Sequence, residues 1–423
     1  MRILWTVNLI PSEAAAALHL TCEVLGGWVE SMAGQLRRDE TVELAIACKT
    51  DREDLHFCET IDRITYYSLS YTPQTKLDVL KTECDRIVEA FHPDVIHVEG
   101  TEFLHAKAML DVGKQRGIPT VASMQGILNG QYQYQCGQLP IDDMMFSKSL
   151  TNIFAAWILH LRKTRWYRPR MKPEREIIES ADYILGRTTW DSAHTYAINP
   201  RAKYFSCSRV LRPPFYETRW SVDTMERHSI YVGNGYYALK GLHFVLQALA
   251  LLRNEYPDVK LYVAGYEPYR ADDKRSMLKK GYAAYLKKLV EDLNLKDHVI
   301  FTGPLKAQAV ADRLSSVNVY VLASAVENSP NTLGEAMLVG TPCVASYVGG
   351  VPDMVTDGEE ALIYRNDDPA IMAWQIKQIF DHDDLACRLS ENGKKRARVT
   401  HDPVRNAEQL MAAYRAILGD VEL

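Results

Sequence analysis

Short apolar segments alternate with helical patterns along almost the whole of this 423-residue chain. The apolar segments lie at residues 2–7, 95–98, 120–123, 230–232, 260–264, 299–301, 319–322 and 342–345. Between them, apolar residues recur at the helical period, as at 241–254, 277–293 and 372–380. Fully apolar strands that alternate with helices are typical of parallel sheets whose two faces are both covered by helices. The pattern therefore predicts an α/β fold of doubly wound, Rossmann-like sheets.

This alternation fades between Leu211 and Asp223 and resumes at Ser229. Two consecutive prolines and several polar residues in the interrupting stretch are typical of a linker between domains. We therefore expect an N-terminal domain at 1–214 and a C-terminal domain at 215–401, since the length of the chain suits two cores better than one.

The last residues, 402–423, carry the signals of a separate helix. Asp402 is a typical N-cap, Pro403 suits the first turn, and Gly419 suits the position just past the last turn. One apolar stripe runs along this helix and contains Val404, Ala407, Leu410, Met411, Tyr414, Ile417 and Leu418. A stripe of this kind requires a packing partner, and we expect the N-terminal domain to provide it.

Composition argues against several classes of protein. The net charge is −5, so the chain lacks the overall basic character of a nucleic-acid-binding protein. Its eight cysteines are isolated and lack the spacing of a zinc site, which favours a reducing compartment and no bound metal. No segment reaches the ~20 consecutive apolar residues that span a bilayer. The start, MRILWTVN, fits a strand better than a secretion signal, so we expect a cytoplasmic protein.

Two carboxylates, Glu327 and Glu335, flank a short polar loop at 328–332. The loop follows an apolar strand and precedes an apolar helix predicted at 331–339. In doubly wound sheets, ligands bind at the carboxyl ends of strands, where the N–H groups of a helix N-terminus attract a diphosphate. Glu335 opens an apolar helix and needs donors, which a ribose diol could supply, while Glu327 could accept hydrogen bonds from a sugar. Alternatively, both are solvated surface charges.

The stretch 327–364, ENSPNTLGEAMLVGTPCVASYVGGVPDMVTDGEEALIY, resembles the E-x7-E signature of retaining, family-4-type (group 1) glycosyltransferases with the GT-B fold. YVGNGYYALKGLHFVLQAL, at 231–249, is similar to the strand, loop and Lys-Gly helix of that family, and LGGWVESMAGQL, at 25–36, to its Gly-Gly loop. HVEGTEFLHAKAML, SMQGIL and GRTTWDSAH resemble a subgroup associated with bacterial capsule and surface polysaccharide synthesis. The resemblance covers nearly the whole chain.

The resemblance implies two Rossmann-like domains that face each other across a cleft. It also implies transfer of a hexose, with retention of configuration, from a nucleotide-diphosphate-sugar to a glycan acceptor that is lipid-linked. No cofactor and no metal are expected beyond that co-substrate, and a UDP-sugar is slightly favoured as the donor. In this scheme the departing phosphate itself accepts the proton of the acceptor hydroxyl.

Several residues match the positions that bind substrates in such enzymes. The expected donor-binding residues are Gly27, Asn234, Lys240, Leu305, Glu327, Asn331, Thr332, Leu333 and Glu335. The expected catalytic residues are Lys240, Glu327 and Gln125, and Glu99 and Glu102 are candidates for contact with the acceptor. Lys240 could neutralise the charge of the leaving phosphate, although a solvated surface lysine is the simpler interpretation. Likewise, Gly27 fits an ordinary tight turn, and Glu99 and Glu102 fit structural roles.

Two departures from the family pattern leave other functions open. Asn234 stands where the family commonly has arginine, and Gln125 stands where many relatives have histidine; Arg187 is a candidate for the missing cation. A non-catalytic protein of the same fold, which binds a nucleotide-sugar or a partner enzyme, is therefore one alternative. Another is an NAD-dependent dehydrogenase, because Gly233–Ala238 matches G-x-G-x-x-A and Glu255 follows about twenty residues later.

The segment from Met144 to Lys172 is the most unusual in composition. It contains seven Lys and Arg residues, no acid and several interleaved aromatic residues. A basic stretch with aromatic residues is typical of a membrane-surface contact, and a lipid-linked acceptor would make such a contact useful at the inner face of the membrane. The alternative is a partly buried pair of helices with a solvated, charged end.

Overall fold

The computed structural model describes residues 1–20, 26–52, 54–139, 157, 161, 165, 167–269 and 280–419. The chain forms two compact units. The first unit comprises residues 1–130, 169–212 and 401–423, and the second comprises 131–168 and 213–400. The chain thus passes from the first unit to the second twice, after Gly130 and after Arg212, and returns after Arg168 and after Thr400.

The first unit is built on an eight-stranded sheet with the order β3-β4-β2-β1-β5-β6-β7-β8. All neighbouring strands are parallel except β3 and β4. The strands are β1 (Arg2–Val7), β2 (Glu43–Thr50), β3 (Cys58–Ile61), β4 (Ile64–Ser70), β5 (Val95–Glu99), β6 (Thr120–Ser123), β7 (Tyr183–Gly186) and β8 (Lys203–Ser206). Because later strands are added on both sides of β1, the order reverses between β1 and β5.

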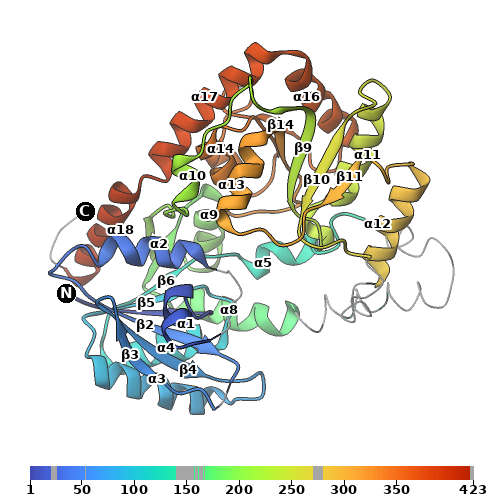
Figure 1. Cartoon of the computed structure of the whole chain (residues 1–423). Coiled ribbons are helices and arrows are strands. Elements are labelled where there is room, and N and C mark those ends of the chain that lie inside the picture. Colours follow the sequence, from blue (N-terminus) through green and yellow to red (C-terminus); the bar gives the residue numbers. More distant parts are fainter. Residues whose placement is uncertain are drawn as a thin grey trace. The chain divides into compact units, whose positions relative to one another are not determined.

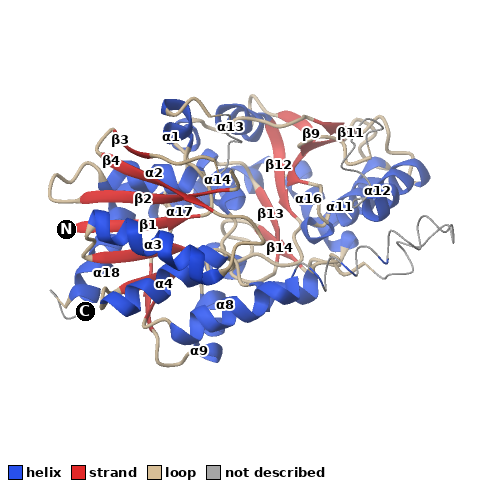
Figure 2. Cartoon of the chain, turned by 90° about the horizontal axis from the view of Figure 1, so that it is seen from below, coloured by secondary structure: helices blue, strands red, loops and turns tan. Residues whose placement is uncertain are grey.

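Helices cover both faces of this sheet (Figure 2). They are α1 (Ser12–Ala17), α2 (Gly27–Leu36), α3 (Leu77–Phe91), α4 (Leu104–Arg116), α5 (Leu128–Gln131), α8 (Arg168–Ser180), α9 (Thr189–Ile198) and α18 (Pro403–Leu418). A 3-10 turn, η1 (Tyr132–Tyr134), follows α5 and groups with the second unit. One core joins the sheet to α3 and α4, through residues such as Leu80, Ile87 and Met109. The other core joins it to α2 and α18, through Leu36 and Leu410.

The C-terminal helix α18 belongs to the first unit, and Figure 1 shows its red ribbon beside α2, drawn in blue. The Asp402 carboxylate accepts the Arg405 N–H at 2.8 Å, and Gly419 ends the helix in the left-handed conformation, with φ +83°. Both signals were predicted from the sequence and are confirmed. Most of the predicted apolar stripe is buried, but Val404 is 58% exposed, so its expected place in the packed stripe is wrong.

The second unit contains a six-stranded parallel sheet with the order β11-β10-β9-β12-β13-β14. Its strands are β9 (Glu226–Asn234), β10 (Lys260–Ala264), β11 (Val299–Phe301), β12 (Val317–Leu322), β13 (Cys343–Ser346) and β14 (Leu362–Tyr364). Its helices are α10 (Pro214–Glu217), α11 (Leu242–Arg253), α12 (Lys280–Asp292), α13 (Ala307–Ser316), α14 (Asn331–Val339), α15 (Val351–Met354), α16 (Pro369–Asp381) and α17 (Asp383–Thr400), with a 3-10 turn, η3 (Ala238–Lys240), before α11. The order reverses between β9 and β12, as in a dinucleotide-binding sheet.

Residues 131–139 group with the second unit, whereas the sequence placed everything before 215 in the first domain. Their contacts explain the grouping. Burial lowers the pKa of His243 to about 3, so the ring is neutral. Its Nε2–H then donates to the Gly137 carbonyl at 3.1 Å, and its Nδ1 accepts the Tyr282 hydroxyl at 3.0 Å. A carbonyl that meets a buried, neutral histidine fixes this segment against α11.

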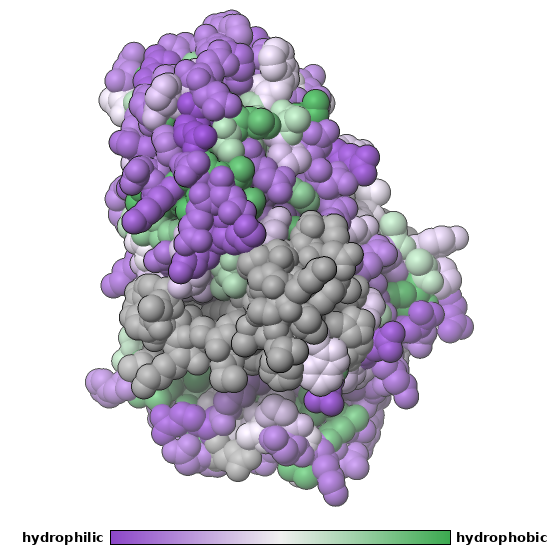
Figure 3. All heavy atoms as spheres, turned by 90° about the vertical axis from the view of Figure 1, so that its right-hand side faces the viewer, coloured by the Kyte–Doolittle hydropathy of each residue, from purple (hydrophilic) through white to green (hydrophobic). Residues whose placement is uncertain are grey.

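On the face shown in Figure 3, hydrophilic side chains cover most of the described surface, and apolar ones form small groups. None of the described helices combines the length and the hydrophobicity that a membrane crossing requires.

Candidate functional site

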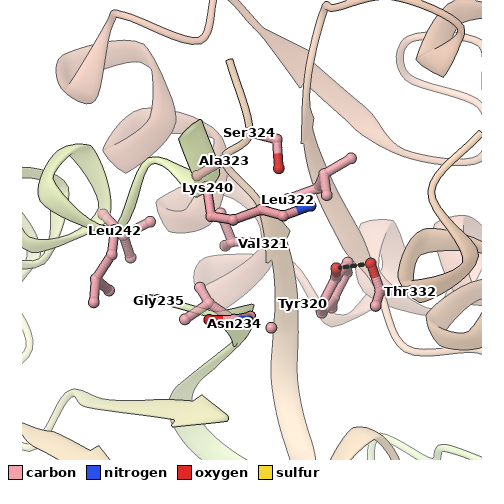
Figure 4. Close-up of a pocket in the computed structure, with 13 residues that line it drawn as sticks. Asn234, Gly235, Lys240, Leu242, Tyr320, Val321, Leu322, Ala323, Ser324 and Thr332 are labelled. Atoms are coloured by element: carbon pink, nitrogen blue, oxygen red, sulfur yellow. Dashed lines mark hydrogen bonds between the residues drawn. The ribbon is translucent and has the colours of Figure 1, made fainter. Parts of the chain in front are cut away.

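The carboxyl ends of β9 and β12 meet at a hollow in the second unit. This is the point at which the strand order reverses, where open α/β sheets bind their ligands. The hollow measures about 460 Å³, counting the space that opens to solvent. Its lining comes from the loop after β9, the end of β12 and the start of α14, and it includes Gly233, Asn234, Gly235, Lys240, Tyr320, Ser324 and Thr332 (Figure 4).

Two close backbone contacts shape the loop that follows β12. Gly241 has φ +71°, and a Cβ atom there would lie 1.9 Å from the Ala323 carbonyl oxygen. Gly349 has φ +50°, and a Cβ atom there would lie 1.8 Å from the Glu327 carbonyl oxygen. Only glycine permits such approaches at a positive φ, so the two glycines fix the path of the loop. The Ala325 N–H adds a hydrogen bond of 2.8 Å to the Leu239 carbonyl.

Lys240 and Glu327 form an ion pair at the hollow. The Lys240 Nζ donates to Glu327 Oε1 at 2.5 Å, and the Ser324 hydroxyl donates to the same oxygen at 2.6 Å. The Glu327 side chain is 15% exposed and the Lys240 side chain 34%, so the pair sits at the boundary with solvent. Figure 4 shows the ammonium group reaching across the hollow toward the end of β12. The structure therefore brings the two predicted catalytic residues of this unit together.

The start of α14 offers backbone donors to the hollow. The Leu333 N–H already donates to the Pro330 carbonyl at 3.1 Å, whereas the N–H groups of Asn331 and Thr332 have no partner within the described part of the chain. The Thr332 hydroxyl accepts the Tyr320 hydroxyl at 2.9 Å, which holds the first turn against β12. Leu333 was predicted as a backbone donor to the ligand, and its N–H is engaged elsewhere.

Two other predicted donor-binding residues do not line this hollow. Glu335 is buried, with 4% of its surface exposed, one turn into α14. Leu305 is half-buried in the loop between β11 and α13. A ribose contact by Glu335 and a base contact by Leu305 stay predictions.

Asn234 serves the backbone turn after β9. Its Oδ1 accepts the Tyr236 N–H at 2.8 Å, a local side-chain turn that an arginine could not make. Among the described lining residues, Lys240 supplies the single cation, in agreement with the expected loss of an arginine here. The dinucleotide alternative receives no support from this geometry. Helix α11 begins at Leu242, after the glycines, and Glu255 pairs on the surface with Lys377 instead of ending a strand.

In the first unit, Gly27 opens α2 as predicted, after Gly26 in the left-handed conformation with φ +80°. A Cβ atom on Gly27 would lie 2.7 Å from the side chain of Arg212. The glycine therefore makes room for an arginine stem in this unit. Contact of Gly27 with a phosphate stays a prediction.

Glu99 and Gln125 meet at the carboxyl ends of β5 and β6. The Gln125 amide donates to Glu99 Oε2 at 3.2 Å, and Arg209 Nη2 lies 3.6 Å from the same oxygen. Burial raises the pKa of the Glu99 carboxyl, but the charges of Arg209 and Arg187 and the hydrogen bond from Gln125 lower it further, so it lies below its ordinary value. Glu99 is therefore ionised.

Glu102 lies close by, and its environment differs. Burial raises the pKa of this carboxyl to about 7. Its Oε2 is buried and has no hydrogen-bond partner among the described residues. Two acids three positions apart thus carry different protonation, which the sequence alone did not indicate.

The loop that carries Gln125 is fixed by side chains from distant parts of the chain. Arg187 Nη2 donates to the Met124 carbonyl at 2.5 Å and to the Gln125 carbonyl at 3.3 Å. The buried Glu174 of α8 accepts the N–H groups of Leu128 at 2.8 Å and Asn129 at 2.9 Å, and thereby caps α5. Arg187 was considered for the missing donor-site cation; it lies in the first unit.

The remaining predictions concern metals and the basic segment. The described residues contain no group of three His, Cys, Asp or Glu side chains that could hold a metal ion.

Most of 144–172 lies outside the described residues, so the membrane contact predicted for it stays a prediction.

Solved structures with a similar fold match the chain over its whole length. Sucrose-phosphate synthase from Thermosynechococcus elongatus has a TM-score of 0.69 and 19% identity, with 100% of both chains covered. HepE from Anabaena, solved with UDP-glucose, has a TM-score of 0.69 and 14% identity, with 98% of this chain and 100% of HepE covered. Together with the two parallel-sheet α/β domains, these matches define the GT-B fold.

A narrower match lies within the second unit. Residues 216–396 match the family described as glycosyl transferases group 1. Similar proteins include a D-inositol 3-phosphate glycosyltransferase of Corynebacterium urealyticum, 28% identical over 181 residues, which are 42% of this chain and 41% of that protein. N-acetyl-alpha-D-glucosaminyl L-malate synthase of Bacillus anthracis is 27% identical over 202 residues, 48% of each chain. The chain thus spans under half the length of these relatives.

Proposed function

We propose that this chain is a glycosyltransferase that takes a sugar from a nucleotide-diphosphate-sugar, with a UDP-sugar as the favoured donor. The observation that carries the proposal is the hollow at the β9/β12 reversal, which is lined by the cationic Lys240 and by Thr332 in the first turn of α14. The group 1 match covers the same residues, and HepE, which shares the fold, was solved with UDP-glucose. A diphosphate is the ligand that such donors suit.

In this proposal each group has a separate task. As the sugar–phosphate bond breaks, the diphosphate gains negative charge, which Lys240 and the N–H groups of Asn331 and Thr332 stabilise. Both described bonds to Glu327 use Oε1, which leaves Oε2 for a sugar hydroxyl. Glu335 is assigned to the ribose on the basis of its position one turn into α14.

We propose a retaining reaction without a protein nucleophile. The acceptor oxygen attacks the anomeric carbon from the side of the leaving group, and the bond to the phosphate oxygen breaks. The proton of the acceptor hydroxyl passes to the departing phosphate. Gln125 then needs only to orient a hydroxyl by hydrogen bonding, so glutamine in place of histidine is compatible with turnover.

The acceptor is assigned to the first unit, near Glu99 and Glu102. The sequence resemblance favours a lipid-linked glycan in surface or capsular polysaccharide synthesis, and the basic segment at 144–172 is assigned to the inner face of the membrane. Several relatives are named as transferases with small anionic acceptors, such as inositol phosphate and malate, which argues for a phosphate or a carboxylate on the acceptor.

The decisive experiment measures nucleotide binding and turnover in matched variants. UDP, GDP, ADP, their common sugars and NAD are tested for thermal stabilisation of the wild type, Lys240→Gln, Glu335→Ala and Lys287→Gln. Lys287 is an exposed lysine of α12, so its variant controls for the lost charge. A ligand at 100 times its dissociation constant stabilises by about 2.7 kcal/mol, which is readily measured. We expect UDP to stabilise the wild type and the control, and to stabilise Lys240→Gln much less.

Turnover separates the remaining alternatives. With a bound UDP-sugar, the proposal requires product and UDP release, and about a 100-fold lower rate in Lys240→Gln, because a single transition-state donor contributes about that much. Protection by UDP without any product would favour the non-catalytic alternative. Protection by NAD alone, or an unchanged response in Lys240→Gln, would contradict the proposed donor site.

A further inference from the structure

The first unit contains a second hollow, at its own point of strand reversal. It lies at the carboxyl ends of β1 and β5, bordered by the start of α2 and the segment after β8, and measures about 410 Å³ counting the space that opens to solvent. Its polar lining consists of Trp28, His97, Glu99, Ser123, Arg187, Cys207, Ser208 and Arg209. Switch points are where ligands bind in such sheets, so the position alone directs attention to these side chains.

Four of these side chains present a buried polar atom that lacks a hydrogen-bond partner among the described residues. The atoms are Trp28 Nε1, His97 Nε2, Arg187 Nε and Arg209 Nη2. Leaving even one buried donor unsatisfied is costly, and most native structures contain few such groups. His97 Nε2 and Arg209 Nη2 lie 3.5 Å and 3.6 Å from the Glu99 oxygens without forming hydrogen bonds. Four such atoms around one hollow indicate that a ligand completes the set.

The histidine tautomer determines whether all four atoms are donors. The Tyr414 hydroxyl lies 2.9 Å from Trp5 Nε1 and 2.6 Å from His97 Nδ1. Trp5 can only donate, so the hydroxyl accepts from Trp5 and sends its own proton to Nδ1 of the histidine. Burial lowers the pKa of His97, which keeps the ring neutral. The remaining ring proton is therefore on Nε2, and all four atoms are donors.

Charge distinguishes a bound anion from trapped water. Arg187 and Arg209 face the hollow, and Glu99 is the acid on the described lining. Arg209 lies 3.6 Å from Glu99, too long for a hydrogen bond, and stacks on the Trp28 ring with its guanidinium carbon 4.2 Å from the ring centre. Burial lowers the pKa of Arg209 to about 9. Water can satisfy donors, but it cannot neutralise the second guanidinium.

We propose that this hollow binds a phosphate or carboxylate group and, resting on the transfer proposed above, that the group belongs to the acceptor. Oxyanions offer acceptors only, which matches four donors, and two guanidiniums can bind such a group with short, charge-assisted hydrogen bonds. His97 and Trp28 supply neutral donors that fix its orientation. The acceptor of this chain is therefore an acidic or phosphorylated molecule.

The test measures phosphate binding in the full-length chain. Inorganic phosphate, hexose 6-phosphate and unphosphorylated hexose are titrated calorimetrically with UDP present, which occupies the other hollow. The same titrations are made on Lys240→Gln, so that the result does not depend on UDP binding. The variants are Arg209→Gln and Trp28→Phe, and the control is Arg38→Gln, an exposed arginine at the end of α2.

We expect phosphate and hexose 6-phosphate to bind the wild type and the Arg38→Gln control, with the neutral hexose much weaker. Arg209→Gln should weaken phosphate binding by about tenfold or more, and Trp28→Phe by about threefold, in line with charged and neutral hydrogen bonds. If Arg209→Gln does not fold, Trp28→Phe decides, because it keeps an aromatic ring beneath Arg209 while it removes the indole N–H. No phosphate binding, equal binding of the neutral hexose, or affinities unchanged in both variants would overturn the proposal.

A second arm distinguishes the source of the anionic group. Sedimentation with phosphatidylcholine vesicles is compared with and without undecaprenyl phosphate, for the wild type and Trp28→Phe. Binding that requires the lipid phosphate and weakens in the variant identifies a lipid-linked acceptor. Binding of hexose 6-phosphate without vesicle binding identifies a free phosphorylated sugar. If the wild type is stabilised by UDP but does not bind phosphate, this inference is wrong and the proposed donor chemistry is unaffected.

Discussion

The two hollows lie at equivalent points of two similar sheets, yet they are built in opposite ways. In the second unit, backbone contacts at Gly241 and Gly349 shape the loop, and its charged pair, Lys240 and Glu327, is already joined at 2.5 Å. In the first unit, side chains make the hollow and leave polar atoms unpaired. Of the thirteen buried side-chain atoms that lack a hydrogen bond among the described residues, ten lie in the first unit and three in the second.

This difference teaches how each site would respond to its ligand. A loop held by backbone contacts keeps its shape without a ligand, and it presents N–H groups that suit any nucleotide diphosphate. Unpaired buried donors have a cost in the free protein that only a matching ligand relieves, so they select strongly for its chemistry.

The largest expected effect comes from a methyl group added to the backbone-built hollow. In Gly349→Ala the new Cβ would lie 1.8 Å from the Glu327 carbonyl oxygen, so the loop must move. We expect UDP stabilisation and turnover to be lost, and the free energy of unfolding to fall by about 3 kcal/mol or more. Urea unfolding and thermal shift with UDP measure both.

Gly358→Ala is the matched control for this change. Gly358 also has a positive φ, +76°, but no heavy atom lies within 4 Å of its added Cβ. Its free energy of unfolding should fall by only about 1 kcal/mol, because alanine is less stable than glycine in the left-handed conformation. UDP binding should be kept. Equal losses in the two variants would mean that the close approach at Gly349 does not shape the hollow.

The next effect tests the cost of the buried acid Glu102 in the first unit. Burial raises the pKa of Glu102 from 4.5 to about 7, so the folded protein binds a proton that the unfolded chain releases between these values. Wild-type stability should therefore fall as pH rises through this window. Glu102→Gln removes the ionisation, and its stability relative to the wild type should rise by up to about 3 kcal/mol, at about 1.4 kcal/mol per pKa unit.

Urea unfolding of both proteins near pH 4.5 and above pH 7 gives the measurement. Glu89→Gln serves as the control, because Glu89 is exposed on α3. Its stability difference from the wild type should stay small at both pH values. A Glu102→Gln difference that does not grow with pH would show that this carboxyl ionises normally in the folded protein.

Much of the fold, and the meeting of Lys240 with Glu327 at the proposed donor site, could be predicted from the sequence because their signals are local. Strands at 2–7, 120–123, 260–264 and 299–301 and the helix at 331–339 are confirmed residue by residue. The residues Lys240 and Glu327 lie in two motifs, each read from its own strand, loop and helix. Parallel strands bring their carboxyl ends to one edge, so local motifs are enough to place this pair together.

The first hollow could not be predicted because no local pattern contains it. Trp28, His97, Arg187 and Arg209 come from four separate elements, and each by itself resembles an ordinary structural or surface residue. The predicted set of strands also lacks β2, β3, β4, β7, β8 and β14. The spacing of residues along a chain predicts a site only when the residues of that site are close together in the sequence.

The smallest expected effect concerns the tautomer of His97, which Tyr414 controls from the C-terminal helix. In Tyr414→Phe, Nδ1 of His97 loses its donor and Trp5 Nε1 loses its acceptor. Stability should fall by about 1–2 kcal/mol and phosphate affinity by about threefold, because the Nε2–H form is no longer enforced. Side-chain nitrogen NMR of the histidine reports the tautomer directly, which a merely structural loss would not change.

Tyr196→Phe, at a 73% exposed tyrosine of α9, is the control. If His97 keeps its Nε2 proton and phosphate affinity is unchanged in Tyr414→Phe, the histidine is oriented by its other neighbours, and the selectivity of the first hollow does not depend on the C-terminal helix.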